Sequence, residues 1–120
     1  MSELRVLCYL RTHRRVWGLT QRELARLLGL VCGAQVSRIE NSKRAPALRV
    51  ALACQTLFGI PPCDMFPHVH AEVEEQVIRD VYELHEGLAQ ATTPAELRKR
   101  ELYALALGRA VNRPEGFDEV

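Results

Sequence analysis

Apolar residues recur along the chain mostly at helical spacing, and no run alternates as a half-buried strand would. Glycines, prolines and short polar clusters separate the apolar stripes. The pattern predicts an all-α protein with five helices in residues 1–66 and two more in residues 67–113. We expect the first five elements over residues 3–16, 20–28, 34–41 and 46–58, with a short turn over residues 61–66.

The second predicted helix has the clearest boundaries. Thr20 is a candidate N-cap, and Glu23 stands three residues later, which is the spacing of a capping box. Gly29 follows the last apolar residue of the stripe and is expected to close the helix. Its apolar residues, with those of the third predicted helix, are expected to form the core: Leu24, Ala25, Leu28, Val36 and Ile39.

The composition changes after residue 67. An acidic helical stretch is predicted over residues 68–90, and its apolar residues Val77, Val81, Leu84 and Leu88 follow a 4-3-4 spacing. Thr93 and Pro94 then stop and restart the chain, as N-cap and first helical residue of a last helix over residues 95–111. The sequence therefore predicts a domain over residues 1–66 and an acidic helical extension over residues 67–120.

Residues 18–46 place two short helices around a tight, glycine-containing connection, which is a helix-turn-helix arrangement. The segment resembles the phage-repressor/Cro-type helix-turn-helix regulators, the XRE family. The matching pieces fall in order from about residue 4 to residue 66 and include LTQ at 19–21, ELA at 23–25, VSRIEN at 36–41 and LFGI at 57–60. One departure is the seven positions from Gly29 to Val36, where the usual pattern has six.

The resemblance implies a five-helix, lambda-repressor-like domain in a sequence-specific transcriptional regulator, with double-stranded DNA as its partner. The helix at about residues 34–41 would enter the major groove, where glutamine suits adenine and arginine suits guanine. Gln35 and Arg38 would then read bases, Ala34 would touch a thymine methyl, and Ser37 would contact a base or a phosphate. The residues implied in gripping the DNA backbone are Gln21, Arg22, Asn41, Ser42, Lys43 and Arg44.

Two other residues, Glu40 and Trp17, are expected to have structural roles instead. Glu40 lies within the matching segment, but its carboxylate would repel phosphate, so we expect it to pair with a nearby arginine. Trp17 is expected to pack, partly buried, near the end of the first helix.

The charge distribution supports the same interpretation. The whole chain carries 16 Lys and Arg against 15 Asp and Glu, a formal charge of +1, which by itself argues against a nucleic-acid binder. Residues 1–66, however, hold ten basic and four acidic residues, whereas residues 67–120 hold six and eleven. The near-neutral total thus conceals a front half of +6 and a back half of −5, as expected of a DNA reader with an appended module.

The acidic helices admit three interpretations. They could join two copies of the chain into a homodimer through the Val77–Leu88 stripe, fold back as a hairpin within one chain, or bind a different protein. Dimers are common in the family because one helix-turn-helix makes few contacts with DNA. The main functional expectation is a repressor rather than an activator. The alternative is an antitoxin or adaptor that uses these helices to bind a protein partner.

Other classes of function find little support. Cys63, His68 and His70 match no standard zinc spacing, and the chain lacks the phosphate-binding and hydrolase motifs, so we expect no metal, no cofactor and no enzyme. Cys32, in the connection before the third helix, is a minor candidate for a redox sensor. No apolar run is long enough to span a membrane and no signal peptide is recognisable, so a cytoplasmic location is expected.

Overall fold

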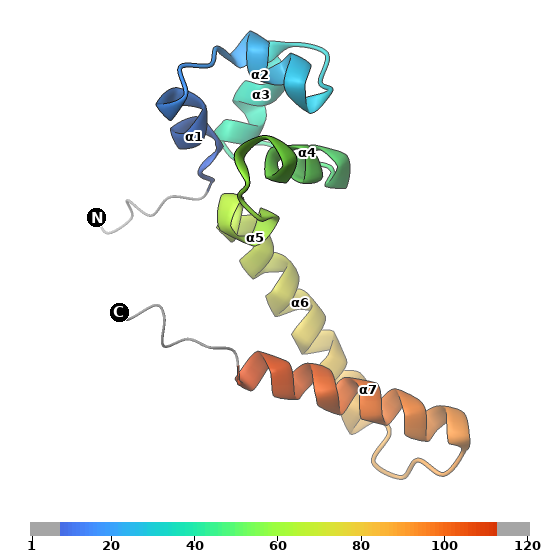
Figure 1. Cartoon of the computed structure of the whole chain (residues 1–120). Coiled ribbons are helices and arrows are strands. Elements are labelled where there is room, and N and C mark those ends of the chain that lie inside the picture. Colours follow the sequence, from blue (N-terminus) through green and yellow to red (C-terminus); the bar gives the residue numbers. More distant parts are fainter. Residues whose placement is uncertain (1–7, 113–120) are drawn as a thin grey trace. The chain divides into compact units, whose positions relative to one another are not determined.

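The computed structural model describes residues 8–112, which are helical apart from short connections (Figure 1). The chain divides into two compact units, an N-terminal unit of residues 1–72 and a C-terminal unit of residues 73–120, with the division inside one helix. The helices of the described residues are α1 (Leu10–Val16), α2 (Gln21–Leu28), α3 (Gly33–Glu40), α4 (Leu48–Phe58), α5 (Pro62–Met65), α6 (Pro67–Glu86) and α7 (Pro94–Val111). The expected all-α fold, with five helices followed by two, is confirmed.

The N-terminal unit is built around one apolar core. Helix α2 packs against both α3 and α4, while α1 contacts α3 and α5 contacts α4. The five residues predicted for the core on α2 and α3 are all buried, and they are joined there by Leu10, Cys54, Met65 and Phe66. Burial of these side chains is the main force that holds such short helices, because helices of seven or eight residues are unstable alone.

The prediction of a helix that starts at residue 3 is wrong for the part of it that the structure describes. Residues 8 and 9 are not helical and α1 begins at Leu10, while residues 3–7 lie outside the described part. The backbone N–H of Tyr9 donates to the carbonyl of Met65 at 2.9 Å. This bond holds the segment before α1 against the end of α5, so it does not continue the helix.

Two further boundaries and one side chain differ from the prediction. Helix α4 begins at Leu48 rather than Pro46, because Ala47 is extended and serves as its N-cap. Helix α6 ends at Glu86 and turns replace the expected helix over residues 87–90. Trp17 is 70 % exposed, because α1 ends at Val16 and places Arg14, not the indole, against the interior.

The C-terminal unit contains α6 from Val73 onwards and the whole of α7, and residues 87–93 connect the two helices. Thr93 accepts a hydrogen bond from the N–H of Glu96, and the Glu96 side chain accepts one from the N–H of Thr93, so the N-cap predicted at this restart is confirmed. The guanidinium of Arg100 donates to the carbonyls of Leu88 and Ala89. These contacts fix the connector to the second turn of α7.

Candidate DNA-binding surface

Local hydrogen bonds fix both ends of α2. At its start, Thr20 Oγ1 accepts from the N–H of Glu23 at 3.0 Å and Glu23 Oε1 accepts from the N–H of Thr20 at 2.9 Å, which confirms the capping box. At its end, the N–H of Leu30 donates to the carbonyl of Ala25, across a Gly29 with φ +75°. This Schellman turn requires a left-handed backbone conformation at its closing residue, which glycine adopts without strain. The turn directs the chain towards α3.

The connection between α2 and α3 is closed by a side chain of α3 itself. Helix α3 begins after Cys32, whose side chain makes no capping hydrogen bond. Instead, Gln35 Oε1 accepts from the N–H of Val31 at 2.8 Å. A Cβ atom on Gly33 would lie 3.3 Å from the Cβ of Gln21, so the absence of a side chain at Gly33 lets the two helix starts approach closely. The additional residue of this connection is thus accommodated by Gln35 and Gly33.

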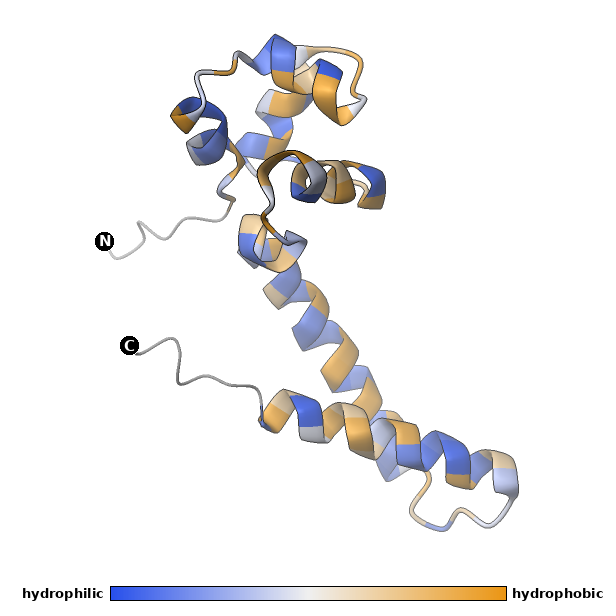
Figure 2. Cartoon of the chain, in the orientation of Figure 1, coloured by the Kyte–Doolittle hydropathy of each residue, from blue (hydrophilic) through white to orange (hydrophobic). Residues whose placement is uncertain are grey.

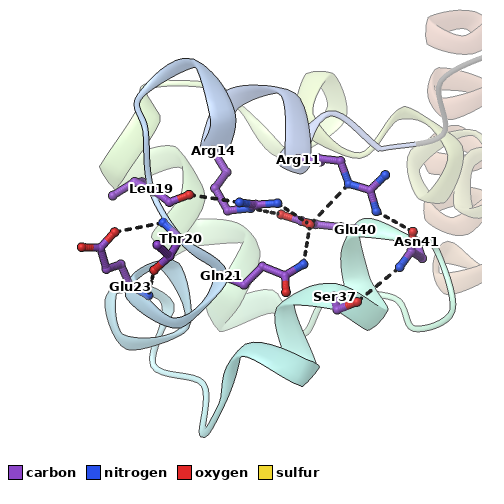
Figure 3. A network of polar contacts seen from close by, with 9 residues as sticks. All are labelled: Arg11, Arg14, Leu19, Thr20, Gln21, Glu23, Ser37, Glu40 and Asn41. Atoms are coloured by element: carbon purple, nitrogen blue, oxygen red, sulfur yellow. Dashed lines mark hydrogen bonds and ion pairs between the residues drawn. The ribbon is translucent and has the colours of Figure 1, made fainter.

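A buried carboxylate joins the first three helices (Figure 3). The Glu40 side chain, with no exposed surface, accepts from Arg14 Nε at 2.6 Å and from Arg14 Nη2 at 3.2 Å. It also accepts from Gln21 Nε2 at 3.1 Å and lies 3.5 Å from Arg11 Nε. The expectation that Glu40 pairs with an arginine is therefore confirmed, and the partner is Arg14 on α1.

The network also determines the ionisation of Glu40. Burial by itself raises the pKa of this carboxyl, since it removes the charged form from water. The hydrogen bonds from Arg14 and Gln21 and the positive charges of Arg14 and Arg11 act in the opposite direction and outweigh burial, so the pKa of Glu40 lies below its ordinary value. Glu40 is consequently a carboxylate at neutral pH, and the buried guanidinium of Arg14 is neutralised.

The residues predicted to contact DNA fall into two groups. Three of them, Gln21, Gln35 and Ser37, are half-buried, and their side chains bond to Glu40, Val31 and Asn41 respectively. The others are exposed: Arg22 on α2, Ala34 and Arg38 on α3, and the segment Asn41–Arg44 that follows α3. Helix α3 and the segment after it therefore present an exposed, mostly polar surface. Beneath it lie the half-buried side chains that are hydrogen-bonded within the domain.

Arg11 was not among the predicted site residues, although it belongs to the same surface. Its Nη2 donates to Asn41 Oδ1 at 2.6 Å, and Asn41 Nδ2 donates to Ser37 Oγ at 3.3 Å (Figure 3). Arg11 thus connects α1 to the end of α3. The available signal was its place three residues before Arg14 on α1, because residues at that interval share one helix face.

Residues 18–65 match the family model described as helix-turn-helix. This matched segment of the N-terminal unit is similar to XRE-family helix-turn-helix domains. Domains of this family bind DNA in transcription regulation, and the match supports a DNA-binding transcription regulator. Neither a curated protein nor a solved structure matches the chain significantly.

In this helix-turn-helix domain, α3 holds the position of the recognition helix and α2 that of the helix before it. The Glu40 network then fixes the recognition helix to both α1 and α2 through its last residue. Within residues 8–112, no helix is long and apolar enough to cross a membrane, and no three His, Cys, Asp or Glu side chains are grouped so that they could hold a metal ion.

Proposed function

We propose that the protein is a cytoplasmic repressor that binds a specific DNA operator as a homodimer, with α3 in the major groove. The observation that carries this proposal is the cationic edge of α3 and of the segment after it. Arg38, Lys43 and Arg44 are exposed and form no ion pair with any residue in the described part of the chain. Unpaired cations on one edge suit the regular phosphates of duplex DNA.

Base reading is assigned to the exposed face of α3. Arg38 is free to bond a guanine in the bidentate manner that gives arginine its specificity. Gln35 already uses Oε1 to accept from Val31, which orients its side-chain amide and leaves Nε2 available as a donor to a base. Ala34 is placed to contact a thymine methyl, and Ser37 to contact a base or phosphate near the same face.

Phosphate contacts are assigned to the ends of the two helices. Gln21 and Arg22 begin α2, where the helix dipole favours an anion, while Asn41, Ser42, Lys43 and Arg44 follow α3. Because Gln21 and Asn41 are already bonded to Glu40 and Arg11, their side chains are held in place before DNA arrives. Preorganised groups lose less conformational entropy on binding.

The decisive experiment is selection of bound sequences from random duplex DNA with the full chain. The proposal expects one preferred sequence, repeated as two symmetric half-sites, because a two-fold protein dimer reads DNA symmetrically. A reporter gene with that sequence at its promoter should be expressed less when the protein is present. Failure to enrich any sequence above the starting pool would overturn the operator assignment, and increased expression would overturn repression.

A pair of matched variants separates the proposed surface from charge in general. Lys43→Ala/Arg44→Ala removes two exposed cations from the segment after α3, whereas Arg98→Ala/Arg109→Ala removes two exposed cations from α7. The first variant should bind DNA at least tenfold more weakly, and the second within about twofold of the wild type. Equal losses would mean that the positive charge acts without a defined surface.

A second candidate, in which the helices of the C-terminal unit bind a different protein as an antitoxin or adaptor, is favoured by the apolar side chains exposed there. Whether another copy or another protein covers them is decided by the oligomeric state of the pure chain.

A further inference from the structure

One side of α3 combines exposed positions with a half-buried hydroxyl. The helix is built of both hydrophobic and hydrophilic residues (Figure 2), and its hydrophobic residues Val36 and Ile39 face the core. Ser37 lies three residues after Ala34 and four before Asn41, so these three residues share one side of the helix. Ala34 and Asn41 are exposed and Ser37 is half-buried. The Ser37 hydroxyl therefore lies at the edge of the surface that the proposed function assigns to DNA.

A hydrogen-bond relay of three side chains, Arg11, Asn41 and Ser37, reaches this hydroxyl from α1 (Figure 3). Arg11 Nη2 donates to Asn41 Oδ1 at 2.6 Å, and Asn41 Nδ2 donates to Ser37 Oγ at 3.3 Å. The Arg11 guanidinium is also held by Glu40, whose Oε1 lies 3.5 Å from Arg11 Nε. The relay thus joins a fixed cation on α1 to the last turn of α3.

The direction of the relay follows from the chemistry of its first member. A guanidinium has only donors, so the atom of the Asn41 side-chain amide that faces Arg11 must be its oxygen. The amide nitrogen then faces Ser37, and this nitrogen can only donate. Ser37 Oγ is therefore used as an acceptor inside the protein, and its own O–H is left over.

This O–H has no acceptor in the part of the chain that the structure describes. A helical serine or threonine often donates to the carbonyl four residues earlier. Thr56 on α4 does so, with Oγ1 at 3.1 Å from the carbonyl oxygen of Leu52. Ser37 makes no such bond to Gly33, although both residues are described. Its O–H is thus available to an acceptor outside the protein.

We propose that Arg11 is a positioning residue that, through Asn41, fixes the Ser37 hydroxyl as a hydrogen-bond donor to an acceptor atom of DNA. This inference rests on the proposed function and deepens it, because it gives Ser37 one polarity and gives Arg11 a part in recognition. The acceptors are phosphate oxygens and, in the major groove, guanine N7 and O6, adenine N7 and thymine O4. The amino groups of cytosine and adenine are donors and are not recognised.

Asn41→Asp tests the direction while keeping the shape of the relay. A carboxylate still accepts from Arg11 but has no donor, so the Ser37 hydroxyl turns inward to it. The probe is the duplex sequence enriched from random DNA, bound by the full chain. Ser37→Ala should weaken this binding about fivefold in the wild type and only within about twofold in Asn41→Asp. Ser42→Asp is the matched control, because it adds the same charge at the next exposed position, and there the effect of Ser37→Ala should remain about fivefold.

A conservative pair of variants tests the part played by Arg11. Arg11→Lys keeps a side chain that can only donate, whereas Arg11→Met leaves the Asn41 amide free to turn. Ser37→Ala should keep its effect of about fivefold in Arg11→Lys and retain only about twofold in Arg11→Met. Because each effect is measured within one background, a general change in positive charge cancels.

The relay is also measured without DNA. In NMR spectra of the free, isotope-labelled protein, the side-chain amide protons of Asn41 should shift in Arg11→Met and in Ser37→Ala. They should stay in place in Arg15→Met, which removes an exposed arginine one turn further along α1. This readout does not respond to a general loss of stability, because it reports on one amide in the folded protein.

Repeated selection with Ser37→Ala distinguishes the two sources of the acceptor. Loss of preference at one base pair identifies a base atom, and a uniform loss with an unchanged sequence identifies a phosphate oxygen. The proposal is overturned if Ser37→Ala has no effect in the wild type, if its effect is equal in Asn41→Asp and Ser42→Asp, or if Arg11→Met and Arg15→Met leave the Asn41 signals alike. These results would leave the proposed function intact, whereas a wild type that enriches no sequence would refute that function and the DNA acceptor with it.

Discussion

Glu40 is the residue whose replacement tests the architecture of the DNA-binding domain most directly. The substitution Glu40→Gln keeps the size and one accepting oxygen of the side chain but removes its charge. Arg14, with only 11 % of its side chain exposed, then remains in the interior without a counter-charge. One of its hydrogen bonds survives, from Nη1 to the carbonyl of Leu19 at 3.0 Å.

Removal of one partner from a buried ion pair costs about 3–5 kcal/mol, mainly because the other charge is left uncompensated. The surviving bond to Leu19 and the glutamine oxygen offset part of this loss, so we expect about 3 kcal/mol. A unit of 72 residues is stable by roughly 4–11 kcal/mol, so the variant should still fold. With a denaturant dependence of about 1 kcal/mol per molar urea, its unfolding midpoint should fall by roughly 3 M.

The assay must report on the N-terminal unit alone, and Cys54 provides that signal. Its thiol is fully buried in the core of that unit, so pulse alkylation at increasing urea measures the unfolding of this core. Glu101→Gln, at an exposed site on α7, is the control and should shift the midpoint little. Arg14→Met/Glu40→Leu replaces both charges by apolar side chains and should recover most of the lost stability.

The pH dependence has a defined sign. Because the folded-state pKa of Glu40 is lowered, its contribution is fully present above the ordinary glutamate pKa and is lost as pH falls through the folded value. The stability difference between wild type and Glu40→Gln should therefore be largest near pH 7 and shrink below about pH 4. A difference under 1 kcal/mol at pH 7, or a double variant as unstable as the single one, would refute the reasoning.

Four other outcomes are expected. Arg38→Ala should weaken operator binding by about 1–3 kcal/mol and relax the preference at one base pair, and unchanged selected sequences would remove Arg38 from the base readers. Lys43→Ala should weaken binding to all DNA sequences alike and reduce the slope of log affinity against log salt concentration by about one unit, so an unaltered slope would contradict a phosphate contact. Thr20→Ala should destabilise the N-terminal unit by about 1 kcal/mol, measured by urea unfolding, without altering the selected operator. Burial raises the pKa of Cys54 to about 12, so at pH 8 iodoacetamide should modify exposed Cys32 within minutes and Cys54 only on unfolding, and equal rates by mass spectrometry would oppose this.

Local signals in the sequence were sufficient for most of the helix boundaries. The capping boxes at Thr20 and Thr93 and the left-handed turn at Gly29 depend on residues within a few positions of each other, and the structure contains all three. The start of α1 depends instead on a bond from Tyr9 to Met65, which is distant in the sequence. Helical spacing alone cannot reveal such a tether.

The candidate site was predictable to a similar extent. That Glu40 pairs with an arginine followed from its charge near a phosphate-binding surface, but the choice of Arg14 depends on how α1 crosses α3. The hydrogen bond from Val31 to Gln35 could not be predicted. The connection before α3 has one additional residue, so the residue that caps α3 cannot be assigned by counting positions. Arg11 was overlooked because its contact with Asn41 joins residues 30 positions apart.

The arginines of the N-terminal unit are divided by what surrounds them, and this division connects the fold to the proposed function. Arg14 donates two hydrogen bonds to the buried carboxylate of Glu40, so it contributes no net charge to the surface. Arg38, Lys43 and Arg44 have no acidic partner among the described residues, so their counterions come from solvent. Release of such counterions drives binding to DNA. A chain with almost no net charge can therefore bind a polyanion, because eleven of its fifteen acidic residues lie after residue 67 and Glu40 is buried against Arg14.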